Sequence, residues 1–206
     1  MSDEQVRDEV ISFLFAGHAS TADTLTWIWY ELSQHAEVEH RLWEEIDTVL
    51  HGEYPGIADL PQLPYARMVI DETLRLYPAG NILARRALAD DNICGYHIPA
   101  NSQVMGNIYA THRHPAYWEQ PEAFNPDRFS PNDHLSEGPR RAYFPFGSGP
   151  HLCIGNNFAL MALQILLIMI VQRYQLQLPP GQAVEPVCRI SISPRHGLPM
   201  FLKERT

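Results

Sequence analysis

The residues best suited to chemistry in this sequence surround Cys153, one of three cysteines. Residues 146–155 read FGSGPHLCIG and lead directly into a long apolar stretch. Gly147 and Gly149 permit backbone conformations that a β-carbon disfavours. A cysteine at the start of a helix lies near unpaired backbone N–H groups and a partial positive charge, which both favour the thiolate over the thiol. We therefore predict a stabilised thiolate at Cys153, with a buried and inert cysteine as the alternative.

The rest of this segment indicates what the thiolate faces. Gly155 lets a bulky, flat group approach the backbone closely, and Phe146 can pack beside the sulfur. The spacing of the segment resembles the haem-binding signature of cytochrome P450 enzymes, F-G-x-G-x-[R/H]-x-C-x-G. The resemblance implies that Cys153 is the axial thiolate ligand of a haem b iron and that His151 contacts a haem propionate. It places Phe146, Gly147 and Gly155 in the cofactor-binding site as well. Thiolate ligation pushes electron density onto the iron and favours O–O cleavage.

An acid and a base three residues apart form a second pattern. Glu72 and Arg75 share one face of a predicted helix, because side chains at i and i+3 lie together. Taken alone, the pair is typical of a surface salt bridge worth less than about 1 kcal/mol. Its context resembles the P450 K helix, and FNPDRF, which contains Arg128, resembles the family's F-x-P-x-R-F signature. The resemblance implies that both residues bond Arg128 in a buried network that supports the haem loop.

Two further segments resemble parts of the family near the cofactor. Arg85 stands where the family often keeps a propionate-binding arginine, and Arg86 is the competing candidate. Residues 80–83 resemble a stretch that lines the family's substrate pocket. The sequence HRHPAYW at residues 112–118 resembles the family's H-R-D-P-x-x-W stretch. We assign this stretch no catalytic role and expect it to shape the fold.

The segment AGHAST, which begins at Ala16, is the candidate for the oxygen side of the site. A glycine inside a helix costs about 1 kcal/mol relative to alanine. Gly17 therefore indicates either a closely approaching ligand or tight helix packing. Ser20 and Thr21 can bond back to carbonyls one turn earlier, which we expect to open the helix locally.

This segment resembles the family's [A/G]-G-x-[D/E]-T-[T/S] motif, which forms an oxygen-binding groove and delivers protons. Ala16 and Gly17 match the motif, which implies that both adjoin the haem. Ser20 and Thr21 are then the candidate catalytic hydroxyls. Ala19 occupies the position of the usual acid, so we expect slow or poorly coupled oxygenation, with more peroxide released than from a variant with glutamate at 19.

These residues must be positioned by the elements that the apolar pattern predicts. The first predicted helix has apolar residues on nearly every face, which is typical of a buried helix. Residues 99–102 are expected to join two strands as a hairpin, and residues 112–150 to form a long irregular stretch of the functional kind. The predicted helices cover residues 5–35, 38–50, 65–77 and 154–174, and the predicted strands cover residues 82–87, 92–98, 103–109, 188–192 and 198–202.

Composition narrows the class of protein. The chain has 206 residues, which is enough for one substantial core. Its net charge of −9 argues against nucleic-acid binding, which needs a clustered positive surface. An odd number of cysteines without a CxxC pair predicts neither a disulfide framework nor a zinc site, and favours a reducing, cytoplasmic location. No stretch reaches the ~20 apolar residues that a membrane span needs.

Together these patterns predict a mainly α fold with small β-sheets. The resemblance implies the C-terminal portion of the cytochrome P450 fold, with the I, J, K and L helices, the irregular meander and the cysteine-ligand loop. Residues 1–206 are then one partial domain, without the N-terminal half of the family domain. A non-catalytic, haem-binding fragment or remnant remains the alternative to an enzyme.

The resemblance also implies a reaction and partners. A haem-thiolate monooxygenase inserts one oxygen atom from O2 into a small organic, apolar substrate. Its electrons come from a ferredoxin or a flavoprotein reductase. Arg140 and Arg141, just before the cysteine loop, are candidates for steering an acidic electron donor, with a solvated basic pair as the alternative.

Overall fold

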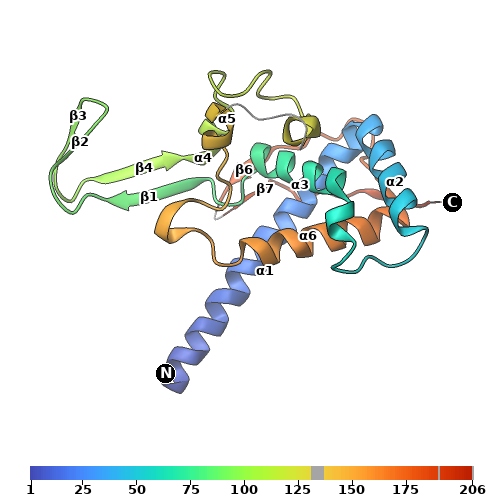
Figure 1. The fold of residues 1–206 in the computed structure, drawn as a ribbon, viewed down its shortest axis with the longest axis horizontal. Coiled ribbons are helices and arrows are strands. Elements are labelled where there is room, and N and C mark those ends of the chain that lie inside the picture. The colour runs from blue at the N-terminus through green and yellow to red at the C-terminus, as the bar shows by residue number, and fades with distance from the viewer. Residues whose placement is uncertain (131–136, 190, 206) are drawn as a thin grey trace.

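The computed structural model describes residues 1–130, 137–189 and 191–205, without the side chains of residues 137, 138 and 140. The predicted class, mainly α with small β-sheets, is confirmed. The α-helices of the described residues are α1 (Asp3–Gln34), α2 (Ala36–Leu50), α3 (Pro64–Leu76), α4 (Ile108–Thr111), α5 (Glu137–Ala142) and α6 (Asn156–Val171). Four two-stranded antiparallel sheets accompany them (Figure 1).

One hydrophobic core holds the helices together. The C-terminal half of α1 packs with α2, α3 and α6, and Ile28, Leu42, Ile70 and Leu167 are fully buried between them. Each helix therefore turns an apolar face toward the same centre, and burial of that face stabilises the helix more than its intrinsic propensity does. Within the part of the chain that the structure describes, no helix is long and apolar enough to cross a bilayer.

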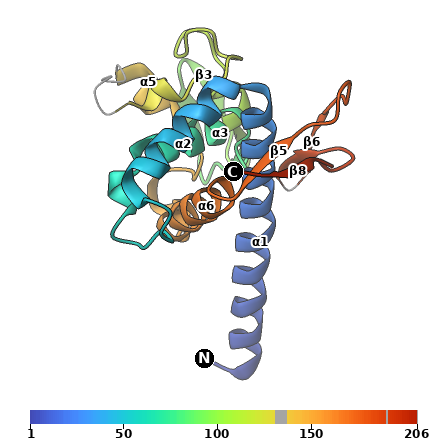
Figure 2. The same cartoon turned by 90° about the vertical axis from the view of Figure 1, so that its right-hand side faces the viewer.

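The first helix is buried over only part of its length, so the prediction of a helix enclosed on nearly all sides is wrong. Ser2 caps the helix and accepts a hydrogen bond from the Gln5 N–H. Figures 1 and 2 show the N-terminal half of α1 projecting from the body of the molecule. There the side chains of Phe13 and Leu14 are 58% and 70% exposed. An apolar pattern predicts burial only where another element packs against that face.

The helix α3 begins at a cap supplied by its neighbour. Pro64 occupies the first turn, where its missing N–H costs nothing. The two carboxylate oxygens of Glu45, on α2, accept hydrogen bonds from the backbone N–H groups of Tyr65 (2.6 Å) and Ala66 (2.9 Å). These donors have no partner inside the helix. The cap therefore sets where α3 starts relative to α2.

The strands after α3 pair differently from the prediction. β1 (Ile82–Arg86) pairs with β4 (Gln103–Asn107), whereas β2 (Asp91–Ile93) pairs with β3 (Tyr96–Ile98). Residues 92–98 thus fold back on themselves. The reason is the two-residue turn at Cys94 and Gly95, whose φ angles of +52° and +86° suit the twist of a tight hairpin. The four strands form an arm that projects from the helices (Figure 1).

The C-terminal segment also differs in detail from the prediction. α6 begins at Asn156 and ends at Val171, two and three residues inside the predicted bounds. β5 (Tyr174–Gln177) pairs with β8 (Phe201–Glu204), and β6 (Pro186–Cys188) pairs with β7 (Ile192–Pro194). Cys188 and Ile192, the two ends of the single strand predicted at 188–192, therefore lie on different strands and pair with each other. The indole N–H of Trp27 donates to the Ile192 carbonyl (2.8 Å), which holds this hairpin against α1.

Candidate functional site

A cavity of about 600 Å³ lies between α1, the C-terminal end of α3 with the segment leading into β1, and the loop before α6 with the first turns of that helix. Its walls are mainly apolar, and Leu74, Leu83 and Phe158 are among them. A cavity of this size accommodates a cofactor or a drug-sized molecule. Eight of the residues predicted to ligate the metal, bind the cofactor or take part in catalysis line it: Ala16, Gly17, Ser20, Thr21, Phe146, Gly147, Cys153 and Gly155.

The loop before α6 holds Cys153 at the cavity wall. The N–H of Cys153 donates to the Phe146 carbonyl (3.0 Å) and the N–H of Gly147 donates to the Phe144 carbonyl (2.9 Å), so the loop closes on itself. Gly147 and Gly149 have φ angles of +76° and +71°, which side-chain-bearing residues rarely adopt. Cys153 is a free and exposed thiol, so it is not buried as the alternative interpretation expected. It lies before the helix, two residues ahead of the N-cap at Gly155.

Gly155 lies next to the sulfur and Gly147 lies next to Leu83, and both glycines line the cavity. A Cβ added at Gly155 would lie 3.9 Å from the Cys153 sulfur. A Cβ added at Gly147 would lie 3.6 Å from Leu83 and 3.8 Å from the His151 carbonyl oxygen. A free, exposed thiol on an apolar wall, next to a glycine, fits a flat and largely apolar cofactor that takes a sulfur ligand. These residues therefore fit a haem.

The opposite part of the cavity is formed by α1. Ala16, Gly17, Ser20, Thr21 and Thr24 line it, because residues three and four apart share one helix face. The Ser20 hydroxyl donates to the Ala16 carbonyl (2.6 Å), and the Thr24 hydroxyl donates to the Ser20 carbonyl (2.9 Å). The local opening expected here is not observed, since α1 is continuous from Asp3 to Gln34. These hydroxyls add to the backbone hydrogen bonds and do not replace them.

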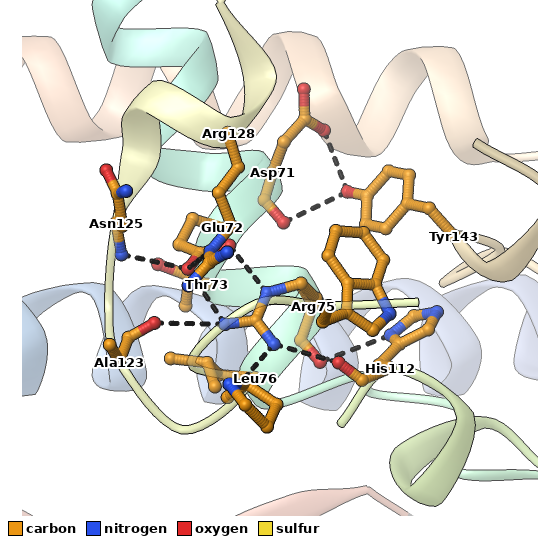
Figure 3. A network of polar contacts seen from close by, with 12 residues as sticks. Asp71, Glu72, Thr73, Arg75, Leu76, His112, Ala123, Asn125, Arg128 and Tyr143 are labelled. Carbon is orange, nitrogen blue, oxygen red and sulfur yellow. Dashed lines mark hydrogen bonds and ion pairs between the residues drawn. The ribbon is translucent and has the colours of Figure 1, made fainter. Parts of the chain in front are cut away.

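Beneath the cysteine loop, Arg75 forms the centre of a buried polar network (Figure 3). Its Nε and Nη2 donate to the two carboxylate oxygens of Glu72 (2.7 and 2.8 Å). Its remaining N–H groups donate to the carbonyls of His112 (2.8 Å), Pro121 (2.7 Å) and Ala123 (3.1 Å). A guanidinium has five N–H donors, and all five are used here. Both Arg75 and Glu72 are fully buried, so the pair is not the surface salt bridge that the motif alone resembles.

Arg128 joins this network through Glu72 and not through Arg75. Its Nε donates to Glu72 Oε1 (3.3 Å), and its Nη2 donates to the Gln120 carbonyl (2.9 Å). The predicted bond between Arg75 and Arg128 is not among the described contacts, because a guanidinium has donors but no acceptor for a second guanidinium. Instead, both donate to Oε1 of Glu72. The Asn125 N–H donates to the same Glu72 oxygen (2.8 Å). The Glu72 carboxylate therefore connects α3 to the 125–128 segment through hydrogen bonds to one charged group.

Two side chains connect this network to the cysteine loop, and neither was assigned that role from the sequence. The His112 ring contacts the Arg75 carbonyl oxygen through Nδ1 (3.1 Å), and its Nε2 accepts from the Phe144 N–H (3.1 Å). The Tyr143 hydroxyl donates toward Asp71 Oδ1 (2.9 Å). Burial raises the pKa of Tyr143, so it stays a donor. In the sequence, His112 was marked by the resemblance of residues 112–118 to a stretch of the family. That resemblance did not indicate which residues His112 would contact.

Two residues expected at the cofactor do not line the cavity. His151 is exposed, as is Arg85 on β1, which bonds the carbonyl of the preceding Ala84 (2.9 Å). Arg85 lies two residues from Leu83 and therefore on the same strand face as this cavity residue. Arg86 faces the other side. Of the expected pocket stretch 80–83, Gly80 and Leu83 line the cavity, whereas Asn81 and Ile82 do not.

Comparison with known proteins gives consistent matches over nearly the whole chain. The sequence profile described as "Cytochrome P450" matches residues 1–197. Cytochrome P450 3A1 of Rattus norvegicus is 40% identical over 178 residues, which are 86% of this chain and 35% of that protein. Cyclooctat-9-en-7-ol 5-monooxygenase of Streptomyces melanosporofaciens is 39% identical over 181 residues, 88% of this chain and 39% of that protein.

A plant protein matches the full chain. Protein LUTEIN DEFICIENT 5, chloroplastic, of Arabidopsis thaliana is 34% identical over 210 residues, 100% of this chain and 35% of that protein. The chain thus spans between 35% and 39% of the length of these three relatives.

Proposed function

The chain belongs to the cytochrome P450 family, and on this premise we propose that it is the cysteine-bearing part of a haem-thiolate monooxygenase. The observation that supports this most directly is one cavity with two kinds of wall. The Cys153 thiol and the hydroxyl-bearing face of α1 both line it. A ligand for a metal and groups able to handle protons therefore face the same space.

Cys153 is the residue that would hold the haem iron, and Phe146 and Gly155 would flank the cofactor. When bound, the haem supplies activation of O2 and insertion of one oxygen atom into an organic substrate. The protein part of the task is to keep the sulfur at the wall of the cavity. The hydrogen bond from the Cys153 N–H to the Phe146 carbonyl (3.0 Å) supports this, because it joins the two ends of the loop.

The cavity wall limits which groups can handle protons. Among the described lining residues there is no carboxylic acid and no histidine, and the hydroxyls belong to Ser20, Thr21 and Thr24. The Ser20 proton is directed to the Ala16 carbonyl, so the Ser20 oxygen is available as an acceptor. Ser20 and Thr21 are thus our candidates for moving protons toward the reacting centre, and Ala19 adds no acid to the helix.

Introducing an acid at this position is expected to improve coupling. In the haem-loaded chain, supplied with a flavoprotein reductase and its nicotinamide, Ala19→Glu should release less hydrogen peroxide per reductant consumed. A carboxylic acid restores a general acid next to Ser20. Ala22→Glu is the matched control, because Ala22 is exposed on the same helix, whereas Ala19 is half-buried. An unchanged peroxide fraction in Ala19→Glu would contradict the assigned role of this position.

Matched substitutions can distinguish which of the two arginines on β1 contributes to haem binding. Arg85→Gln is expected to weaken haem binding about tenfold, the size of effect that loss of one charge-assisted hydrogen bond produces. Arg86→Gln should leave the affinity unchanged, because its side chain faces away from the Leu83 side of the strand. A haem titration followed by absorbance measures both. Equal losses in the two variants, or a larger loss in Arg86→Gln, would remove Arg85 from the propionate site.

The substrate and the electron donor are proposed at the level of chemical class. The apolar wall, with Phe13, Leu83 and Phe158, fits an apolar organic substrate. Family membership implies a ferredoxin or flavoprotein reductase as the donor. Of the two arginines proposed to steer it, Arg141 is exposed on α5, and the side chain of Arg140 lies outside the described residues. The cytoplasmic location stays a prediction.

The proposal is tested by adding haem to the 206-residue chain, reducing it and recording a carbon monoxide difference spectrum. A red-shifted band typical of thiolate ligation is the expected result. Absence of any such band would favour the alternative of a non-catalytic remnant.

A further inference from the structure

The side chain of His112 occupies an unusual place between the charge network and the cysteine loop. It is fully buried. Its ring lies between the Arg75 carbonyl oxygen and the Phe144 N–H, at 3.1 Å from each. Figure 3 shows the ring beside Arg75 and on the same side of α3 as Tyr143. The Arg75 guanidinium, in turn, bonds the His112 backbone carbonyl (2.8 Å), so the two residues hold each other in both directions.

The two partners determine the protonation state of the ring. A carbonyl oxygen only accepts, so Nδ1 of His112 must carry a proton. The Phe144 N–H only donates, so Nε2 must be unprotonated. The ring is therefore neutral and in one tautomer. Burial lowers the pKa of His112 to about 4, and the charge of Arg75 acts in the same direction, which agrees with this state.

Phe144 transmits this contact into the loop. Its N–H is bonded to His112, and its carbonyl accepts from the Gly147 N–H (2.9 Å). Two residues further on, the Phe146 carbonyl accepts from the Cys153 N–H (3.0 Å). A chain of hydrogen bonds thus runs from the Arg75 backbone to the turn that presents the sulfur.

We propose that His112 is a positioning residue, whose ring links the Arg75 carbonyl to the Phe144 N–H and thereby sets the position of the cysteine loop. The role of that loop as a cofactor site rests on the proposed function, but the link itself does not. The neighbouring tether between Tyr143 and Asp71 (2.9 Å) is the competing explanation for the position of the loop. An experiment must therefore remove one link at a time.

Three substitutions of His112 remove the hydrogen-bond donor of the ring, its acceptor, or both. His112→Gln places an amide oxygen near the position of Nε2 and keeps an acceptor for the Phe144 N–H. His112→Asn places an amide N–H near Nδ1 and keeps only the donor to Arg75. His112→Ala removes both. Tyr143→Phe removes the competing tether, and His114→Gln repeats the substitution at an exposed histidine two residues away.

Amide hydrogen exchange on the haem-free chain provides a direct measurement. In His112→Ala and His112→Asn, exchange at Phe144, Gly147 and Cys153 should accelerate about tenfold relative to amides of α6, as expected when a buried hydrogen bond is lost. His112→Gln should retain most of the protection, and His114→Gln should match the unsubstituted chain. Expressing each rate relative to α6 separates a loop effect from general destabilisation.

Several results would overturn the proposal. Acceleration at Phe144 alone, with Gly147 and Cys153 unchanged, would make the His112 contact local. Equal acceleration in α6 would reduce the role of His112 to overall stability. A loss of loop protection in Tyr143→Phe but not in His112→Ala would assign the positioning to Tyr143. If the exchange pattern holds and the chain binds no haem, the proposed function fails and the positioning role stands.

Discussion

Replacing Cys153 with serine is expected to abolish the red-shifted carbon monoxide band of the haem-loaded chain. The serine hydroxyl keeps its proton near neutral pH, whereas a thiolate is the soft, anionic ligand that the proposed site requires. Haem binding should weaken at least about 100-fold, since loss of a residue that merely supports a metal ligand already costs 10–100-fold. A haem titration and a carbon monoxide difference spectrum measure the two effects separately.

The other two cysteines offer matched controls. Cys94 and Cys188 are also free and exposed, and neither lines the cavity. Cys94→Ser and Cys188→Ser should therefore bind haem with an unchanged spectrum. The proposed site is refuted if Cys153→Ser keeps the thiolate band, or if one of the control substitutions removes it.

Replacing Arg75 with glutamine is expected to lower the free energy of unfolding by about 3–5 kcal/mol, the usual cost of removing one partner of a buried ion pair. Glutamine offers two N–H donors where the guanidinium offers five. Of its described partners, the Glu72 carboxylate would keep Arg128 and the Asn125 N–H, and carbonyls at Pro121 and Ala123 would lose their donor. Urea unfolding followed by circular dichroism measures the change.

The same chain contains an exposed pair of nearly identical geometry. Arg195 donates Nε and Nη2 to the two oxygens of Glu185 at 2.8 and 2.9 Å, compared with 2.7 and 2.8 Å for Arg75 and Glu72. The side chains of Arg195 and Glu185 are 47% and 63% exposed, and those of Arg75 and Glu72 are 0% exposed. Arg195→Gln should leave the urea midpoint unchanged, because water replaces the lost partner. Equal effects of the two substitutions would show that burial does not set the cost.

The link at His112 gives the buried network a further consequence. Because the ring joins Arg75 to the residues before Phe146, damage to the network should reach the cysteine loop as well as overall stability. Arg75→Gln is thus expected to raise exchange at Phe144 more than at distant surface amides. The ion pair and the loop then behave as one unit, although Arg75 and Cys153 are 78 positions apart in the sequence.

Features that depend on residues close together in the sequence were predictable, whereas features that depend on residues far apart were not. The cysteine loop was recognisable because its chemistry lies in ten consecutive residues, whose glycines adopt left-handed φ angles at 147 and 149. Part of the face of α1 that lines the cavity was recognised from the resemblance of residues 16–21 to the family motif, and helical spacing places Ala16 and Ser20 on one face. Such local features follow from backbone sterics and helix geometry.

Several contacts were not accessible to that reasoning. The spacing of Glu72 and Arg75 predicted their pairing but not the three carbonyls that use the other Arg75 donors. The pairing of β1 with β4 also escaped prediction, because a tight turn at Cys94 diverted the intervening residues into their own hairpin. Each of these depends on where another segment lies, which local pattern does not encode.

The sequence by itself determined the mainly α class, the family, and the identity of the cysteine that faces the cavity. Only the tertiary structure decided that half of α1 is exposed, that Arg85 and His151 lie outside the cavity wall, and that His112 connects the ion pair to the loop. The physical reason is that side-chain spacing sets the conformation and faces of a single element. Burial and long-range hydrogen bonds arise only when separate elements pack, and a buried donor or acceptor then needs a partner from whichever segment lies beside it.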